Sequence, residues 1–227
     1  MVKEVDQLKE ILALLNLPIS DNALALKVYE TLKHVREQGH GHGITMVLGY
    51  RPELKHHVAP MADDVFDDLH EHINDYHMKE KILNIREIDG AILIDSSGKM
   101  LHSGMFFVVN PLHVLKNMGI TRTNDLGLPE LFGFSRKVGT RHISSISASY
   151  KMPDTLIYAL SEEDSKVRVF LNGRILFSEV DEEIYRGKVP IEELLEPGVK
   201  QKKLPEFKEG ESSVKYPFSD SVAGSLQ

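Results

Sequence analysis

The chain has 227 residues, 41% of them apolar and 27% charged, a balance typical of a globular protein. It contains no cysteine, which excludes disulfides, thiolate metal sites and a cysteine nucleophile. The net charge of −7 and the lack of a clustered basic stripe argue against direct nucleic-acid binding. No apolar run reaches the ~18 residues of a membrane span, and the N-terminal segment is too charged for a signal peptide. We therefore expect a cytoplasmic protein that does not associate with a membrane.

The first part of the chain predicts helices on either side of one strand. Apolar residues at helical spacing predict a helix over 4–16, and Asp21-Asn22 suits the start of a second helix that runs to about Gln38. The segment GHGHG (39–43) interrupts this pattern, and ITMVLGY (44–50) predicts a short buried strand. Residues 61–88 predict a long amphipathic helix, whose acidic first half suits the N-terminal end of a helix dipole.

The second part of the chain predicts two hairpins, with two helices and a further strand between them. Two apolar runs flank the turn sequence DSSGK within residues 89–109, which is typical of a β-hairpin. Residues 110–138 are irregular, with one short helix near 112–118, and a further helix is expected to begin after Gly139. Residues 154–161 and 167–177 predict strands, the latter with a turn at Asn172-Gly173.

Together these elements predict an α/β fold, a mixed β-sheet flanked by helices. We expect an N-terminal helical extension (1–43), a domain of residues 44–180 and a C-terminal extension (181–227). From Pro205 onward the chain is rich in Lys, Glu, Gly and Ser, and this composition predicts a poorly ordered tail.

Two acidic segments suit metal binding or proton transfer. In REIDGAILI (86–94), the carboxylate of Asp89 precedes a strand, and Gly90 and Ala91 allow a ligand to approach the backbone closely. In YALSEEDSK (158–166), a carboxylate at the end of an apolar strand suits Mg²⁺ or Mn²⁺. On its own, each segment is more typical of an ordinary turn.

A third segment, GTRHISS (139–145), suits an anionic ligand. The amide groups at a helix N-terminus lack intrahelical acceptors and lie at the positive end of the dipole. The guanidinium of Arg141 can donate paired hydrogen bonds to phosphate oxygens, and Thr140, Ser144 and Ser145 add hydroxyl donors. The alternative is that Thr140 only caps the helix and Arg141 is a surface charge.

Most of the eleven histidines lie between His34 and His77, which raises a histidine-rich metal-binding protein as one alternative function. However, His70 and His72 are two positions apart on a predicted helix, and side chains at that spacing do not share a face. We therefore favour solvated histidines over a built zinc site.

The order and spacing of these segments resemble the diadenylate cyclase domain, the catalytic module of the DNA-integrity scanning protein and its relatives. The shared features are Asp-Gly-Ala before a hairpin, Gly-Thr-Arg-His opening a helix, and a strand ending in Ser-Glu-Glu followed by VRVFLNGRI. The segment 36–50 also resembles the one that precedes this domain in soluble members. The resemblance covers about 35–177.

The resemblance implies an enzyme that joins two ATP molecules into cyclic di-AMP and releases two pyrophosphates. Each domain of this family binds one ATP and two domains face each other, so we expect a homo-oligomer. A divalent metal ion, Mg²⁺ or Mn²⁺, is the expected cofactor, because an acidic chain needs a cation to offset phosphate charge. The alternative is a nucleotide-binding sensor of the same fold that is catalytically weak or inactive.

The resemblance also assigns roles to individual residues. The expected catalytic residues are Asp89, Arg141 and His142, and the expected metal ligands are Asp89, Glu162 and Glu163. The second hairpin strand is expected to wall the adenine, although an ordinary core strand is an equally good interpretation of its apolar residues. The expected nucleotide contacts are Gly90, Ala91, Met105, Phe106, Thr140, Arg141, Ser144 and Ser161.

Three features depart from the family pattern. Ile143 stands where many members have a second arginine, so one phosphate contact is expected to be missing. Ile88 stands where membrane-anchored relatives have a histidine. The segment 110–138 is longer than expected, and it is either a lid or subunit contact or the source of the missing charge, through Arg122, Arg136 or Lys137.

Overall fold

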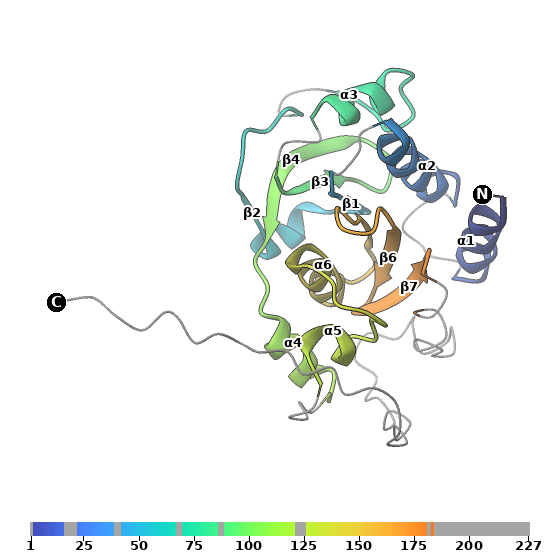
Figure 1. The fold of residues 1–227 in the computed structure, drawn as a ribbon. Coiled ribbons are helices and arrows are strands. Elements are labelled where there is room, and N and C mark those ends of the chain that lie inside the picture. Colours follow the sequence, from blue (N-terminus) through green and yellow to red (C-terminus); the bar gives the residue numbers. More distant parts are fainter. Residues whose placement is uncertain are drawn as a thin grey trace.

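The computed structural model describes residues 2–15, 22–38, 42–66, 70–85, 89–120, 126–180 and 183. In this part of the chain, one sheet is built from β1 (Ile44–Leu48), β2 (Val58–Pro60), β3 (Ala91–Ile94), β4 (Met100–Phe107), β5 (Leu156–Leu160), β6 (Val167–Leu171) and β7 (Arg174–Ser178). The strand order is β2-β4-β3-β1-β5-β6-β7 (Figure 1). β1 and β3 are parallel and the other neighbouring pairs are antiparallel, so the sheet is mixed.

Helices cover both faces of this sheet, as Figure 1 shows. They are α1 (Val2–Leu15), α2 (Asn22–Gln38), α3 (Met78–Asn84), α4 (Pro111–Asn117), α5 (Leu128–Leu131) and α6 (Thr140–Lys151), with a 3₁₀ helix at Pro52–His57. The predicted α/β class, a mixed sheet flanked by helices, is therefore confirmed.

The two faces of the sheet belong to two separate apolar cores. Alternate residues of a strand point to opposite faces, so Met46 of β1 packs in the core under α1, α2 and α3, whereas Val47 packs in the core under α4, α5 and α6. Leu12 of α1 and Val28 of α2 belong to the first core, which places both N-terminal helices directly on the sheet. A sheet buried on both faces needs strands that are apolar throughout, which explains the uninterrupted runs ITMVL and LIYAL.

The long helix predicted over 61–88 is wrong, because within it only α3 is an α-helix among the described residues. The Asp64 carboxylate accepts hydrogen bonds from the Phe66 amide at 3.0 Å, the Ser103 amide at 2.8 Å and the His102 ring at 2.7 Å. A side chain that captures nearby backbone donors competes with helix formation. Here it also ties the segment to β4, so a tertiary contact overrides the amphipathic pattern.

The other predicted elements are confirmed at nearly their expected bounds. The helices over 4–16, 22–38 and 112–118 are α1, α2 and α4, and α6 begins directly after Gly139. Each predicted hairpin is an antiparallel pair, β3 with β4 and β6 with β7. Asn172 and Gly173 have φ of 49° and 79°, the left-handed pair that a two-residue hairpin turn requires. The elements that the sequence pattern does not indicate are β2, α5 and the 3₁₀ helix.

Several sequence predictions concern residues that the structure does not describe. The predicted C-terminal extension (181–227) lies outside the described residues except for Glu183, and so do Ile88, Arg122 and residues 39–41 of the GHGHG segment. Among the residues that are described, no helix is both long enough and apolar enough to cross a bilayer.

Candidate functional site

One pocket gathers the three segments that the sequence singles out. It has a volume of about 390 Å³ and lies where β1, β3 and β4 meet the first turn of α6 and the loop after β5. All of the residues predicted to be catalytic, to bind nucleotide or to bind metal line this pocket. The structure therefore brings together residues that are far apart in the chain, while their chemical roles stay predictions.

The phosphate-binding candidate is the first turn of α6. The residue that precedes the helix is Gly139, with φ −71° and ψ 174°, and no side chain caps the helix start. Thr140 is the first helical residue, so the alternative that it caps α6 is wrong. A Cβ at Gly139 would lie 3.2 Å from Oε1 of Glu163. The small residue therefore lets the loop after β5 come close to the helix start.

Serine residues allow α6 to pack closely on the sheet. Ser147 and Ser149 are buried, and each donates its hydroxyl to a carbonyl of the preceding turn, at 2.6 and 2.8 Å. Ser144 lines the pocket and donates to the Arg141 carbonyl at 3.0 Å. Ser145 has no exposed surface and does not line the pocket, so the expectation that it offers a hydroxyl to a ligand is wrong.

Arg141 lies between two carboxylates at the pocket wall. Its Nη2 is 3.8 Å from Oδ1 of Asp89, and its Nη1 is 3.5 Å from Oε2 of Glu162. The side chains of Asp89 and Glu162 are 66% and 61% exposed, whereas that of Arg141 is 28% exposed. These contacts are long and reach solvent, so a ligand can replace them at little cost.

Gly43 makes room for the Arg141 side chain. A Cβ at position 43 would lie 2.1 Å from Nη1 and 2.8 Å from the Cζ atom of Arg141. Sequence reasoning treated this residue only as part of a chain break. Its position directly before β1, at the end of the GHGHG segment, is the sequence feature that could have identified it.

The charged residues that line the pocket are one arginine and three carboxylates, which leaves an excess of negative charge. In the described part of the chain, no group of three or more histidine or carboxylate side chains is arranged to hold a metal ion. Mg²⁺ is commonly held by one or two carboxylates together with phosphate oxygens and water. The donors present, Asp89 with Glu162 and Glu163, fit a metal ion that arrives with a phosphate ligand.

The opposite side of the pocket is apolar. Met105 and Phe106 of β4 line it together with Met61, and the side chains of Phe106 and Met61 are 44% and 57% exposed. Sequence reasoning missed Met61 because it was assigned to a long helix. It also missed Thr45, which lines the pocket and is only 3% exposed; the one hydroxyl residue in the run ITMVL was the available signal.

His142 lines the pocket but is 3% exposed. The pKa of His142 is lowered from 6.5 to about 3, first by burial and second by the neighbouring positive charge of Arg168. Its Nε2 lies 3.3 Å from Nη1 of Arg168, and a guanidinium can only donate in such a contact. His142 is therefore neutral at physiological pH, which favours a positioning role over the catalytic role expected from the resemblance.

Ile143, the residue that departs from the family pattern, is buried. Ile143 is 8% exposed, packs in the core under α4, α5 and α6, and does not line the pocket. Among the candidates to supply the missing charge, Arg136 and Lys137 do not line the pocket either. Arg136 instead places its Nη1 4.0 Å from Oδ2 of Asp164.

The histidines between His34 and His77 do not converge on one centre in the described residues. His34 contacts Glu80 at 3.0 Å, His77 contacts Glu71 at 3.2 Å, and His72 contacts the Ser97 carbonyl at 2.6 Å. These are separate contacts, and among the described residues they do not form a group of three or more side chains that could hold a metal ion.

Comparison with known proteins points in the same direction as the pocket. No family model matches the chain. The sequence is 25% identical over 135 residues to the diadenylate cyclase of Methanocaldococcus jannaschii. The matched region is 60% of this chain but only 37% of that relative, so the chain spans little more than a third of the relative's length.

Two solved structures show weaker likenesses. A hypothetical membrane-spanning protein from Bacillus cereus matches with a TM-score of 0.47 and 17% identity, over 71% of this chain and 64% of that one. A double cysteine variant of DacA from Staphylococcus aureus matches with a TM-score of 0.42 and 15% identity, over 72% of this chain and 90% of that one. Likenesses of this size do not define a common fold.

The segments Asp-Gly-Ala, Gly-Thr-Arg-His and Ser-Glu-Glu occur in the family's order, and in this structure they converge on one pocket. The sequence match is to a protein of the same family. The chain therefore resembles the diadenylate cyclase domain family.

Proposed function

We propose that this chain condenses two ATP molecules into cyclic di-AMP and two pyrophosphates, with two copies of the domain facing each other. The observation that carries the proposal is the convergence of the Asp89, Arg141 and Glu162 side chains on one pocket. The proposal includes binding of ATP, self-association of the chain and a cytoplasmic setting.

The shape and chemistry of the pocket support an ATP ligand. Its volume of about 390 Å³ lies within the range of roughly 300–1,000 Å³ that is usual for small-molecule sites. The apolar side chains of Met105 and Phe106 suit a purine base. The first turn of α6, with Thr140 and Arg141, suits the phosphates, because unpaired amides and a guanidinium both donate to anionic oxygen.

In the proposed reaction, the 3′-oxygen of one ATP attacks the α-phosphorus of the other. The bond from that phosphorus to the bridging oxygen of the pyrophosphate breaks, and pyrophosphate leaves with the electron pair. Asp89 accepts the hydroxyl proton, and its exposed carboxylate can release it to solvent. A second displacement closes the ring, in which the 3′-oxygen of the other nucleotide attacks the α-phosphorus of the first. Two ATP therefore yield one cyclic di-AMP, two pyrophosphates and two protons.

Positioning carries most of the proposed catalysis. Phosphoryl-type transfer needs alignment and charge neutralisation more than covalent help from the protein. Holding two ATP molecules face to face lowers the barrier by about 7–11 kcal/mol in the best intramolecular cases. A single pocket offers one ATP site, which is why the proposal requires two copies of the chain.

The excess of carboxylates in the pocket supports a requirement for a divalent cation. Asp89, with Glu162 or Glu163, would hold Mg²⁺ or Mn²⁺ together with phosphate oxygens of ATP. When bound, the ion supplies positive charge that offsets the charge developing on the phosphates. Arg141 is the residue of this chain that contributes positive charge at the same place.

One observation favours a second candidate, a sensor that binds nucleotide without turnover. Ile143 is buried in the core at the position where many family members have an arginine, so no side chain from that position reaches the pocket. A missing charge-assisted hydrogen bond to phosphate costs about 1.5–3 kcal/mol, which reduces turnover more if the contact forms only in the transition state.

A product assay tests the proposal. The full chain is incubated with ATP and either Mg²⁺ or Mn²⁺, and the nucleotides are separated by chromatography. We expect cyclic di-AMP and pyrophosphate in a ratio of one to two, with a specific activity that rises steeply with protein concentration. ATP binding by calorimetry without product would favour the sensor, and neither binding nor product would contradict both candidates.

A further inference from the structure

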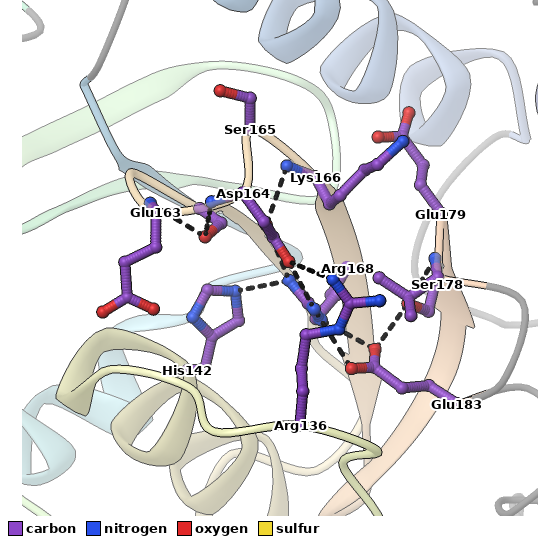
Figure 2. Close-up of polar contacts among 12 residues, drawn as sticks. Arg136, His142, Glu163, Asp164, Ser165, Lys166, Arg168, Ser178, Glu179 and Glu183 are labelled. Carbon is purple, nitrogen blue, oxygen red and sulfur yellow. Dashed lines mark hydrogen bonds and ion pairs between the residues drawn. The ribbon is translucent and has the colours of Figure 1, made fainter.

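A second arginine lies beneath the pocket, on β6, in an otherwise apolar strand. Arg168 has no exposed surface, and its partner Glu183 is also fully buried. Neither residue lines the pocket. Figure 2 shows Arg168 between Glu183 on one side and His142 and Asp164 on the other. A buried charge of this kind needs an explanation, because removing it from water is costly unless it is fully paired.

All five N–H donors of the Arg168 guanidinium have an acceptor. Glu183 accepts from Nε at 2.7 Å and from Nη2 at 3.0 Å, which is a bidentate pair. Asp164 accepts from Nη2 at 2.9 Å and from Nη1 at 3.3 Å. The fifth contact runs from Nη1 to Nε2 of His142 at 3.3 Å. Ser178 also donates to Glu183, at 2.6 Å, so the anchor carboxylate is itself held in place (Figure 2).

The contact with His142 fixes the ring of a pocket residue. Because Arg168 only donates, Nε2 of His142 must carry a lone pair, and the ring proton is on Nδ1. In Figure 2 the other ring nitrogen faces away from Arg168, on the side where Glu163 lies. Both His142 and Glu163 line the pocket. Arg168 therefore decides which nitrogen of His142 can donate a hydrogen bond on the pocket side.

The contact with Asp164 fixes the loop that follows β5. Ser161 accepts hydrogen bonds from the amides of Glu163 and Asp164, both at 3.2 Å, and its own amide donates to the Lys166 carbonyl at 2.9 Å. The pocket residues Glu162 and Glu163 lie inside this closed loop. Anchoring Asp164 to a buried guanidinium therefore restricts where those two carboxylates can point.

A second attachment holds the same loop from the opposite face of the sheet. Arg36 of α2 donates to the Ser165 carbonyl at 3.2 Å and to the Glu179 carboxylate. Glu179 in turn accepts from Tyr29 at 2.6 Å and from the Val167 amide at 2.9 Å. The loop is thus attached at Asp164 and at Ser165, and of these two attachments the one to Arg168 also contacts His142 in the first turn of α6.

We propose that Arg168, anchored by Glu183, is a positioning residue for the pocket: it holds His142 as the Nδ1–H tautomer and fixes the loop that carries Glu162 and Glu163. This inference rests on the proposed function, since the pocket is the one assigned to ATP. It gives Glu183, which follows β7 in the chain, an effect on a site that it does not touch.

The first test measures the tautomer of His142 in the full chain. Long-range proton–nitrogen NMR of ¹⁵N-labelled protein distinguishes the two tautomers, and the His142→Gln variant identifies the signal. We expect Nδ1–H in the wild-type chain and a mixture of tautomers in Glu183→Gln, which keeps the size of the side chain but removes its charge. An Nε2–H ring in the wild type, or an unchanged ring in Glu183→Gln, would overturn the inference.

The second test separates positioning from general stability. We expect Glu183→Gln to lower kcat for cyclic di-AMP formation by about 10- to 100-fold with less than about a twofold change in KM, the pattern of misplaced groups. Glu71→Gln is the control, because Glu71 is likewise a carboxylate in an ion pair, with Lys81, and does not line the pocket, although its side chain is 20% exposed. An equal loss of kcat in Glu71→Gln, or a loss confined to KM, would reject a positioning role.

The two tests also keep the inference separate from the proposed function. If the wild-type chain forms no cyclic di-AMP, the proposed function fails, but the tautomer of His142 can still be measured. In that case the tautomer measurement decides alone. A mixture of His142 tautomers in Glu183→Gln, with a wild-type ring in Glu71→Gln, would support the inference, and equal tautomer populations in the two variants would overturn it.

Discussion

Arg141 and Arg168 each contact two carboxylates, but their surroundings are opposite. The side chain of Arg141 is 28% exposed, and its charged partners, Asp89 and Glu162, lie at 3.8 and 3.5 Å. The side chain of Arg168 is 0% exposed, and its shortest contact with Glu183 is 2.7 Å. The first arginine has long contacts that compete with water, and the second has short contacts in a dry environment.

This difference corresponds to two roles that an arginine can have, binding a ligand or holding other parts of the protein in place. Long, exposed ion pairs are worth about 0–1 kcal/mol, so a phosphate ligand can displace them. A buried pair is costly to break, because the remaining partners are left charged and without water. The burial of Arg168 is offset by its hydrogen bonds to Glu183 and Asp164, which together raise its pKa above the usual value. We therefore expect Arg141 to act on the ligand and Arg168 to act on the protein.

The largest expected effect is on turnover, and it concerns Asp89, an exposed partner of Arg141. Asp89→Asn removes the proposed proton acceptor and is expected to lower cyclic di-AMP formation by about 10²- to 10⁴-fold. Because the Asp89 side chain is 66% exposed, the melting temperature is expected to stay unchanged. The exposed Asp63 does not line the pocket, so Asp63→Asn is the matched control. Turnover by Asp89→Asn equal to that of the control would remove Asp89 from the mechanism.

The next effect is on stability and contrasts the two arginines directly. Arg168→Met leaves the buried Glu183 carboxylate without its partner and is expected to lower the free energy of unfolding by about 3–5 kcal/mol. Arg141→Met is expected to change it by less than about 1 kcal/mol, because its pairs are long and solvated. Urea denaturation of both variants measures the difference. Similar values for the two would show that burial does not distinguish them.

A third effect is the pH dependence of stability that comes from His142. Burial first, and then Arg168, lower the pKa of His142 from 6.5 to about 3, so between these values the unfolded state binds a proton that the folded state does not. The free energy of unfolding contributed by this group is therefore complete above pH 6.5 and falls as the pH drops, by up to about 1.4 kcal/mol per unit.

The His142→Gln variant isolates this contribution. We expect a smaller loss of stability between about pH 6 and pH 5 in His142→Gln than in the wild type, measured by urea denaturation. Burial, the largest cause, also lowers the pKa of His57, which contributes the same slope to both proteins and cancels in the comparison. Identical slopes in the two proteins would mean that His142 is protonated in the folded state.

The smallest expected effect concerns the space around Arg141. A Cβ at position 43 would lie 2.1 Å from Nη1 of Arg141, so Gly43→Ala must displace the guanidinium. We expect ATP binding to weaken by about tenfold, the value of one charge-assisted hydrogen bond, with little change in stability. In the double variant with Arg141→Ala, Gly43→Ala should cause no further loss. An additive loss measured by calorimetry would show that position 43 acts by another route.

Local pattern explains which parts of the fold and site were predictable. The runs ITMVL and LIYAL could be recognised as strands because a sheet covered on both faces needs apolar residues throughout. The start of α6 could be placed from Gly139 and the polar residues after it. The long helix over 61–88 failed because the hydrogen bonds of Asp64 to β4 override the helical spacing, and Met61 was missed with it.

The sequence by itself determined the strands other than β2, the hairpins and the three polar segments, because periodicity and turn residues act over a few neighbouring positions. Only the tertiary structure decided that these segments share one pocket and that His142 is buried and neutral. It also decided the pairing of Arg168 with Glu183. Asp164 is only four residues from Arg168, but the other two partners, Glu183 and His142, lie farther away in the chain and meet Arg168 only in the folded protein.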